Sequence, residues 1–228
     1  MRFNGIEKDY IRVMKELYRP PTPPIEYMVG EGFSGDRIRK RSFLGMDLQV
    51  PIVLTKNPES IKEDLSNWLV HEQPKPLVFK DHPERYYLAI YRGMDLNEDY
   101  QFAKGTVTFY LPEGYRFGPH QEIEIGEQNI GYKVLGQASM PWTSQTIFKE
   151  DTSEFFIEKN QSEKLICHYH FKENDRLEIN SIKRQVLVNG ENKPYILSIH
   201  SNWFELTPGL NHLVANHRTF LNYTERYF

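Results

Sequence analysis

Residues 44–54 alternate between apolar and other side chains more regularly than any other part of the chain. Every second residue is apolar, and Gly, Asp and Gln stand between them. This period of two is that of a β-strand, whose successive side chains point to opposite faces of a sheet. Pro51 has no N–H to give to a neighbouring strand, so this end of the strand should lie at a sheet edge or a bulge. The segment therefore predicts a sheet with one face buried against a core.

One helix is predicted directly after this strand, over residues 58–70. Asn57 can cap its N-terminus, and Pro58 suits the first helical position. Apolar residues then recur at helical spacing on a single stripe: Ile61, Leu65, Trp68 and Leu69. Such a stripe packs against a sheet or another helix. We expect the helix to be an insert that covers the sheet, with Trp68 as its anchor.

The second half of the chain shows no helical pattern. Short apolar runs recur roughly every 8 to 12 residues with turn residues between them, as in a sandwich or jelly roll. Asn189 and Gly190 can supply the two positive φ angles of a tight hairpin turn. The segment 203–206 is also expected to be a strand. The sequence thus predicts a mainly β protein, with a sandwich-like or barrel-like domain over 1–120 that carries the helix, and a β-sandwich domain over 121–228.

Charge and composition exclude several classes of partner. The 28 basic and 31 acidic residues give a net charge of −3, without the cation excess that binds a nucleic-acid backbone. No apolar stretch is long enough to cross a membrane. The charged first residues differ from a secretion signal, and the lone Cys167 allows no internal disulfide, which is typical of a reducing compartment. The basic cluster at 37–41 is expected to be a solvated loop or hairpin tip, with a subunit contact as the alternative.

Few residues suggest chemistry. His168 and His170 share one face of a strand, but Cys167 points to the other face, so a third metal ligand is lacking. The glycines at 30–35 are not followed by the Gly-Lys-Ser/Thr ending of a phosphate loop, and no nucleophile elbow occurs. We therefore predict no enzyme, no catalytic residue, no metal site and no cofactor.

Aromatic residues leave one other function open. Trp142 and Trp203 on a β-sandwich could stack on a sugar ring, which makes a carbohydrate-binding adhesion module the alternative function. The competing interpretation is that these residues fill the core, since alternation places either Trp203 or Phe204 inside and the other outside. No individual binding residue can be assigned.

Several fragments, in the same order along nearly the whole chain, resemble the distal tail proteins of long-tailed phages, the Dit family. In the first half they are residues 2–5, 23–26, 67–69, 75–79, 86–89 and 105–109. In the second half they are residues 174–180, 186–190, 203–211 and 223–228. Residues 120–150 are the least typical part.

The resemblance implies a structural protein of two β domains at the tip of the virion tail, made in the cytoplasm of the bacterial host. In the family, the first domain forms a hexameric ring, and rings can stack in pairs. The second domain is a galectin-like β-sandwich. The partners implied are further copies of the chain, the tail tube protein, the tail-associated hub protein and, in some phages, a receptor-binding protein. Neither a membrane nor sequence-specific nucleic acid is an implied partner.

Overall fold

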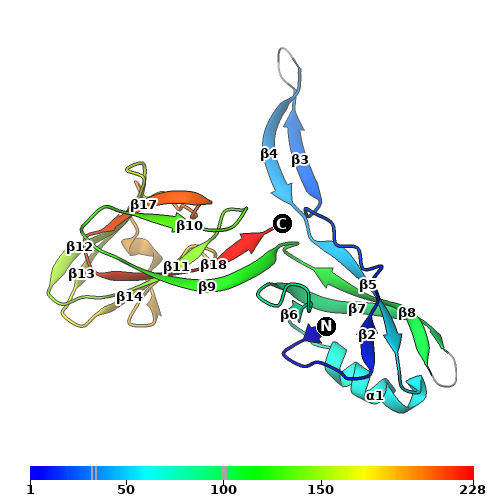
Figure 1. Cartoon of the computed structure of the whole chain (residues 1–228). Helices are drawn as coiled ribbons and strands as arrows, with labels where there is room; N and C mark the ends of the chain where they lie inside the picture. The colour runs from blue at the N-terminus through cyan, green and yellow to red at the C-terminus, as the bar shows by residue number, and fades with distance from the viewer. Residues whose placement is uncertain (32, 34, 99–101) are drawn as a thin grey trace. The chain divides into compact units, whose positions relative to one another are not determined.

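The computed structural model describes residues 1–31, 33, 35–98 and 102–228, and it consists mainly of strands (Figure 1). The chain divides into two compact units. Unit 1 comprises Met1–Phe117 together with Phe228, and unit 2 comprises Gly118–Tyr227. The predicted mainly β fold class is confirmed.

Unit 1 contains a single path of paired strands, in the order β2, β5, β8, β7, β6 and β1. Their bounds are β1 (Arg2–Phe3), β2 (Ile11–Val13), β5 (Met46–Leu54), β6 (Lys75–Val78), β7 (Tyr86–Glu98) and β8 (Ala103–Leu111). The long strand β7 pairs first with β6 and then with β8, and its register with β8 shifts between Tyr91 and Gly93. A bulge of this kind bends the strand. Two further strands, β3 (Ile25–Gly30) and β4 (Arg37–Phe43), form a separate hairpin.

The predicted helix is α1 (Pro58–Leu69). The side-chain oxygen of Asn57 accepts a hydrogen bond from the N–H of Glu59 at 3.0 Å, which caps the first turn. Trp68 is buried, and its indole N–H donates to the carbonyl of Phe3 at 3.1 Å. The rings of Trp68 and Phe3 also meet edge to face. The expected anchoring role of Trp68 is confirmed.

Pro51 lies within β5 instead of ending it. β5 pairs with β8 along its whole length but with β2 only from Ile52 to Leu54. The N–H of Met14, just after β2, donates to the carbonyl of Pro51 at 2.9 Å. Both backbone groups of a strand residue point to the same side, so the ring nitrogen of Pro51 faces the side on which β2 has just ended. Pro51 thus lies where one side of β5 has no paired strand, which confirms the expected edge position for this residue.

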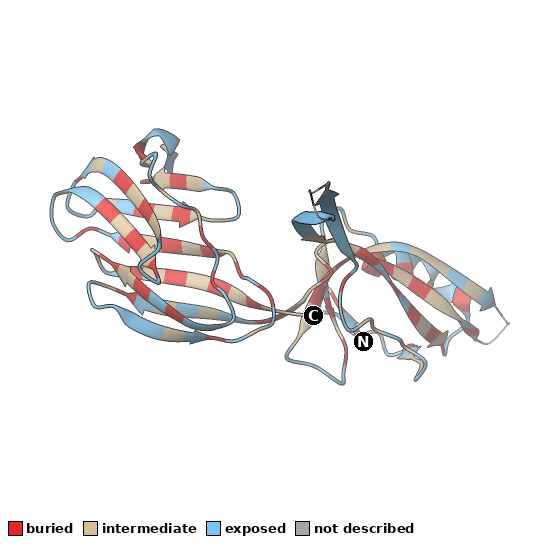
Figure 2. Ribbon diagram, turned by 90° about the horizontal axis from the view of Figure 1, so that it is seen from above, coloured by how far each residue is buried: buried red, intermediate tan, exposed pale blue. Residues whose placement is uncertain are grey.

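Unit 2 is a sandwich of two sheets, with strand orders β16-β15-β14-β11-β18-β9 and β10-β17-β12-β13. The first sheet contains β9 (Arg116–Ile125), which starts in unit 1, and β11 (Trp142–Ile147), β14 (Arg176–Asn180), β15 (Gln185–Val188), β16 (Glu191–Asn192) and β18 (Thr219–Tyr227). The second contains β10 (Ile130–Val134), β12 (Thr152–Lys159), β13 (Glu163–Phe171) and β17 (Gly209–Ala215), and a short 3₁₀ turn η1 (Pro194–Ile196) precedes β17. Buried and less buried residues alternate along these strands (Figure 2).

Two local predictions for unit 2 have different outcomes. Asn189 and Gly190 have φ angles of 52° and 84° and join β15 to β16 as the predicted tight turn. The strand expected over 203–206 is wrong, because within it only Leu206 makes an isolated bridge, with Met140. Two carbonyls of this segment accept hydrogen bonds from side chains instead. Trp142 donates to Phe204 at 2.9 Å and Lys159 to Glu205 at 2.8 Å.

Candidate assembly surface

The β3–β4 hairpin is the most exposed apolar feature of unit 1. It projects from the sheet (Figure 1), pairs with no other strand of the described chain, and is exposed along most of its length (Figure 2). Met28, Val29 and Ile38 keep 60%, 55% and 66% of their surface in water. A two-stranded hairpin is marginally stable in water, and clustered exposed apolar residues usually mark an interaction site. The hairpin is therefore the first candidate binding surface.

The two strands of the hairpin differ in charge. The basic cluster Arg37, Arg39, Lys40 and Arg41 lies on β4, whereas β3 carries Glu26. These cations are solvated, as expected, but they lie along a strand with one bulge and not in a loop or at the tip. Both faces of the hairpin are exposed, so consecutive residues can all carry charge without burying it.

The free edge of β2 is the second candidate binding surface. The carbonyl of Tyr10 accepts a hydrogen bond from Thr55 at 2.9 Å, and the N–H of Met14 also bonds to the β5 side. Because backbone groups alternate in direction along an antiparallel strand, the N–H and C=O of Val13 and the carbonyl of Ile11 point away from β5. No strand of the described residues pairs with this edge.

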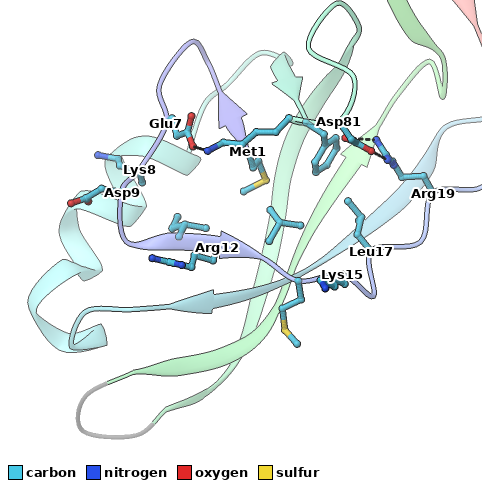
Figure 3. Close-up of a pocket in the computed structure, with 14 residues that line it drawn as sticks. Met1, Glu7, Lys8, Asp9, Arg12, Lys15, Leu17, Arg19 and Asp81 are labelled. Atoms are coloured by element: carbon cyan, nitrogen blue, oxygen red, sulfur yellow. Dashed lines mark hydrogen bonds and ion pairs between the residues drawn. The ribbon is translucent and has the colours of Figure 1, made fainter.

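A hollow of about 670 Å³ lies against this edge (Figure 3). We call the hollow and the edge together the β2 slot. Its apolar lining comes from Met1, Ile11, Val13, Met14, Leu17 and Phe79. Five of its charged groups are neutralised within the chain, in the three ion pairs Glu7–Lys80, Arg19–Asp81 and Lys8–Asp64. Arg12 and Lys15 line the slot without an ion-pair partner among the residues that the structure describes.

The residues considered for chemistry do not form a site. Cys167 is fully buried, and burial raises the pKa of its thiol to about 12, so it stays protonated at neutral pH. His168 and His170 are exposed, and the Nδ1 of His168 lies 3.4 Å from a carboxylate oxygen of Glu154. Within the described ranges, no group of three or more His, Cys, Asp or Glu residues is placed to hold a metal. No helix in the same ranges is long and apolar enough to cross a membrane.

The aromatic residues considered for sugar contact lie mainly in the core. Trp142 is 1% exposed and its indole N–H is bonded to a carbonyl, so the expectation that it could stack on a sugar is wrong. Of the neighbouring pair, Phe204 is buried and Trp203 is partly buried against the same core. A hollow of about 320 Å³ on the outer face of the first sheet of unit 2 includes Thr143, Gln145 and Asn222 but no aromatic side chain.

Comparisons with known proteins cover both units. Residues 6–111 match the family described as phage tail protein RIFT-related domain, and residues 135–227 match the siphovirus-type tail component, C-terminal domain. The distal tail protein of Bacillus phage SPP1 is 25% identical over 207 residues, which span 86% of this chain and 82% of that protein.

Solved structures have the same fold. The crystal structure of the SPP1 Dit protein, described as a hub of the adsorption apparatus, aligns over 100% of this chain and 98% of its own with a TM-score of 0.85 at 22% identity. A chain of the phage P2 baseplate in its activated conformation aligns over 95% of this chain and 90% of its own, with a TM-score of 0.52 at 7% identity.

The two β units and the matches to both of them define a structural component of a phage tail. Within that class, the chain belongs to the distal tail protein family of siphophages. The predicted family is confirmed.

Proposed function

We propose that this protein forms a ring of six copies at the tip of the tail, where it joins the tail tube to the baseplate hub and the receptor-binding apparatus. Unit 1 forms the ring, and unit 2, a galectin-like sandwich, contacts other tail-tip proteins. The protein acts without catalysis or a cofactor. It is made in the cytoplasm of the host before it enters the virion.

The exposed β3–β4 hairpin is the observation that carries this proposal. Its apolar residues stay in water in the single chain, so covering them favours association. The β2 slot is a second, different surface of the same unit. Contact between two different surfaces is head to tail, and such contacts generate a closed ring when the rotation between neighbours divides a full turn. Twofold dimers instead use one surface on both partners.

The ring is tested by measuring mass in solution and imaging the particles. We expect mass photometry of the full chain to show six-subunit particles, or two such rings stacked, and negative-stain images to show sixfold averages. If the chain alone stays monomeric, the tail tube protein of the same phage is added as a nucleus. Monomers or twofold dimers under both conditions would contradict the proposal.

The carbohydrate-binding alternative is less well supported. It requires an aromatic platform, but Trp142 is buried and the polar hollow on unit 2 has no aromatic lining. A glycan array with the full chain tests it directly. Selective glycan binding that Trp203→Ala removes, without loss of folding, would favour the alternative over a purely architectural role.

A further inference from the structure

We propose that β3 of one copy adds as a new strand to the free edge of β2 in the next copy, antiparallel, with Glu26 opposite Arg12. This inference rests on the proposed ring and specifies the contact that builds it. The two surfaces match in backbone direction, in side-chain character and in charge.

Backbone geometry sets the register. On β2, Ile11 and Val13 direct their free backbone groups away from β5. On β3, the N–H of Leu44 donates to the carbonyl of Pro24 at 2.9 Å, and Glu26 lies opposite Ser42. Pro24 and Glu26 therefore direct their backbone groups toward β4. Ile25 and Tyr27, which alternate with them, direct theirs to the outer edge of the hairpin.

Both free edges thus present odd-numbered residues. An antiparallel ladder then pairs Ile11 with Tyr27 and Val13 with Ile25 through backbone hydrogen bonds, and it places Arg12 opposite Glu26.

The same register matches the side chains. Ile25 and Tyr27, which are 38% and 49% exposed, fall on the face of Ile11 and Val13, which line the apolar part of the β2 slot. Arg12 and Glu26 fall together on the other face, in a non-hydrogen-bonded pair, where side chains of facing strands are closest. Neither has an ion-pair partner within the described part of its own chain.

Charge decides which edge of the hairpin enters the slot. The β2 slot holds two uncompensated cations, Arg12 and Lys15. Addition of β4 would place Arg39 or Arg41 near them, and like charges on facing strands are destabilising. Addition of β3 brings Glu26 instead. The cations of β4 therefore oppose the wrong pairing while the carboxylate of β3 favours the right one.

Engineered cysteines test the register. Arg12→Cys and Glu26→Cys chains are mixed under the conditions of ring assembly and oxidised, and the disulfide-linked dimer is measured on a non-reducing gel. The buried Cys167 contributes no background because its thiol is inaccessible and protonated. The control mixture contains Arg12→Cys and Ser42→Cys chains. Ser42 lies opposite Glu26 on β4, one strand further from the proposed contact. We expect about tenfold more dimer from the first mixture, since a disulfide forms only where the two Cβ atoms nearly touch.

A charge exchange provides an independent readout. Arg12→Glu or Glu26→Arg alone should lower the fraction of chains in rings by about fivefold, because each places like charges opposite one another. The double variant Arg12→Glu/Glu26→Arg should restore ring formation. Circular dichroism of each variant monitors folding, and both side chains are exposed, so loss of the fold is not expected.

The outcomes separate this inference from the proposed function. Rings without excess cross-linking of positions 12 and 26 would overturn the strand addition and leave the ring intact. Specific cross-linking in assemblies of another size would support the strand addition and overturn the hexamer. Absence of both rings and cross-links would overturn the two proposals together.

Discussion

Asn211 is fully buried and forms four hydrogen bonds within one turn of unit 2. Its oxygen accepts from the N–H and the hydroxyl of Thr207 at 3.1 and 3.2 Å, and its nitrogen donates to the carbonyls of Thr207 and Gly209 at 2.7 and 3.2 Å. A buried amide is tolerated only when its donors and acceptors are satisfied in this way. The side chain therefore fixes the turn that leads into β17.

Asp64 has a comparable structural role at the surface of unit 1. It lies on α1, and its carboxylate accepts hydrogen bonds from Lys8, at 2.6 Å, and from the hydroxyl of Tyr10. The Lys8 amine, followed by the Tyr10 hydroxyl, lowers the pKa of Asp64 from its ordinary value of 3.8. This contact links the segment before β2 to the helix.

The lowered pKa of Asp64 gives a testable pH dependence. A carboxyl whose pKa is lower in the folded state contributes stability above its unfolded pKa, and the contribution is lost as the pH falls through the folded value. We expect Asp64→Asn to lower the melting temperature slightly at pH 7 and to have a smaller effect below about pH 3. Glu63→Gln, at the neighbouring helix position, is the control. An equal effect of Asp64→Asn at both pH values would exclude this contribution.

At the scale of single elements, the pairing of β7 with β8 depends on one glycine. Gly105 lies opposite Leu96, and a Cβ built on it would lie 2.0 Å from the carbonyl oxygen of Asp95. This atom belongs to the backbone of a paired strand and cannot move without separating the two strands. Glycine is required here for the close approach of β7.

Gly105→Ala should therefore destabilise unit 1 by about 1–3 kcal/mol through overpacking. Chemical denaturation followed by circular dichroism measures the loss. Gly93→Ala is a matched control on the same strand pair, since no neighbouring atom lies within 4 Å of a Cβ at that position. Similar losses for the two variants would show that backbone crowding at Gly105 is not the cause.

Strong local patterns made several elements predictable from the sequence. The alternation of 46–54, the capped stripe of α1 and the turn at Asn189 each depend on neighbouring residues alone. The segment 203–206 was misassigned because its alternation resembles a strand, whereas side chains distant in sequence, Trp142 and Lys159, take its carbonyls. The β2 slot was also missed, since an unpaired edge depends on which strands meet in space. The first strand of the hairpin does have a local pattern, since the apolar residues Ile25, Tyr27 and Val29 recur at period two.

At the scale of the whole molecule, the two units have separate cores. One buried cluster includes Phe3, Trp68 and Phe109, and the other includes Trp142, Phe148 and Leu221. Phe148 stacks on Phe171 with ring centroids 4.2 Å apart in the second cluster. Each unit therefore has the apolar interior that an independent folding unit needs.

Separate cores should make the units respond separately to a core substitution. We expect Trp142→Ala to destabilise unit 2 by about 3–5 kcal/mol, because it leaves a large cavity and an unsatisfied carbonyl at Phe204. Hydrogen exchange measured by mass spectrometry should show faster exchange in the paired strands β11 and β18 of unit 2. Protection of the paired strands β5 and β8 of unit 1 should not change. Trp203→Ala, at a partly exposed site, should have a smaller effect. Equal deprotection of both units would indicate a single cooperative fold.

The exposed hairpin also has a consequence for the newly made protein. Two bare strand edges with apolar side chains can template fibrils and disordered precipitates as readily as ordered particles. The four cations on β4 oppose such association, because their mutual repulsion keeps the exposed edges of different chains apart in dilute buffer. Solutions of the isolated chain should therefore remain clear at low ionic strength and become turbid as salt screens the repulsion. Chains already assembled into rings should stay clear, because the neighbouring copy covers the strand edges.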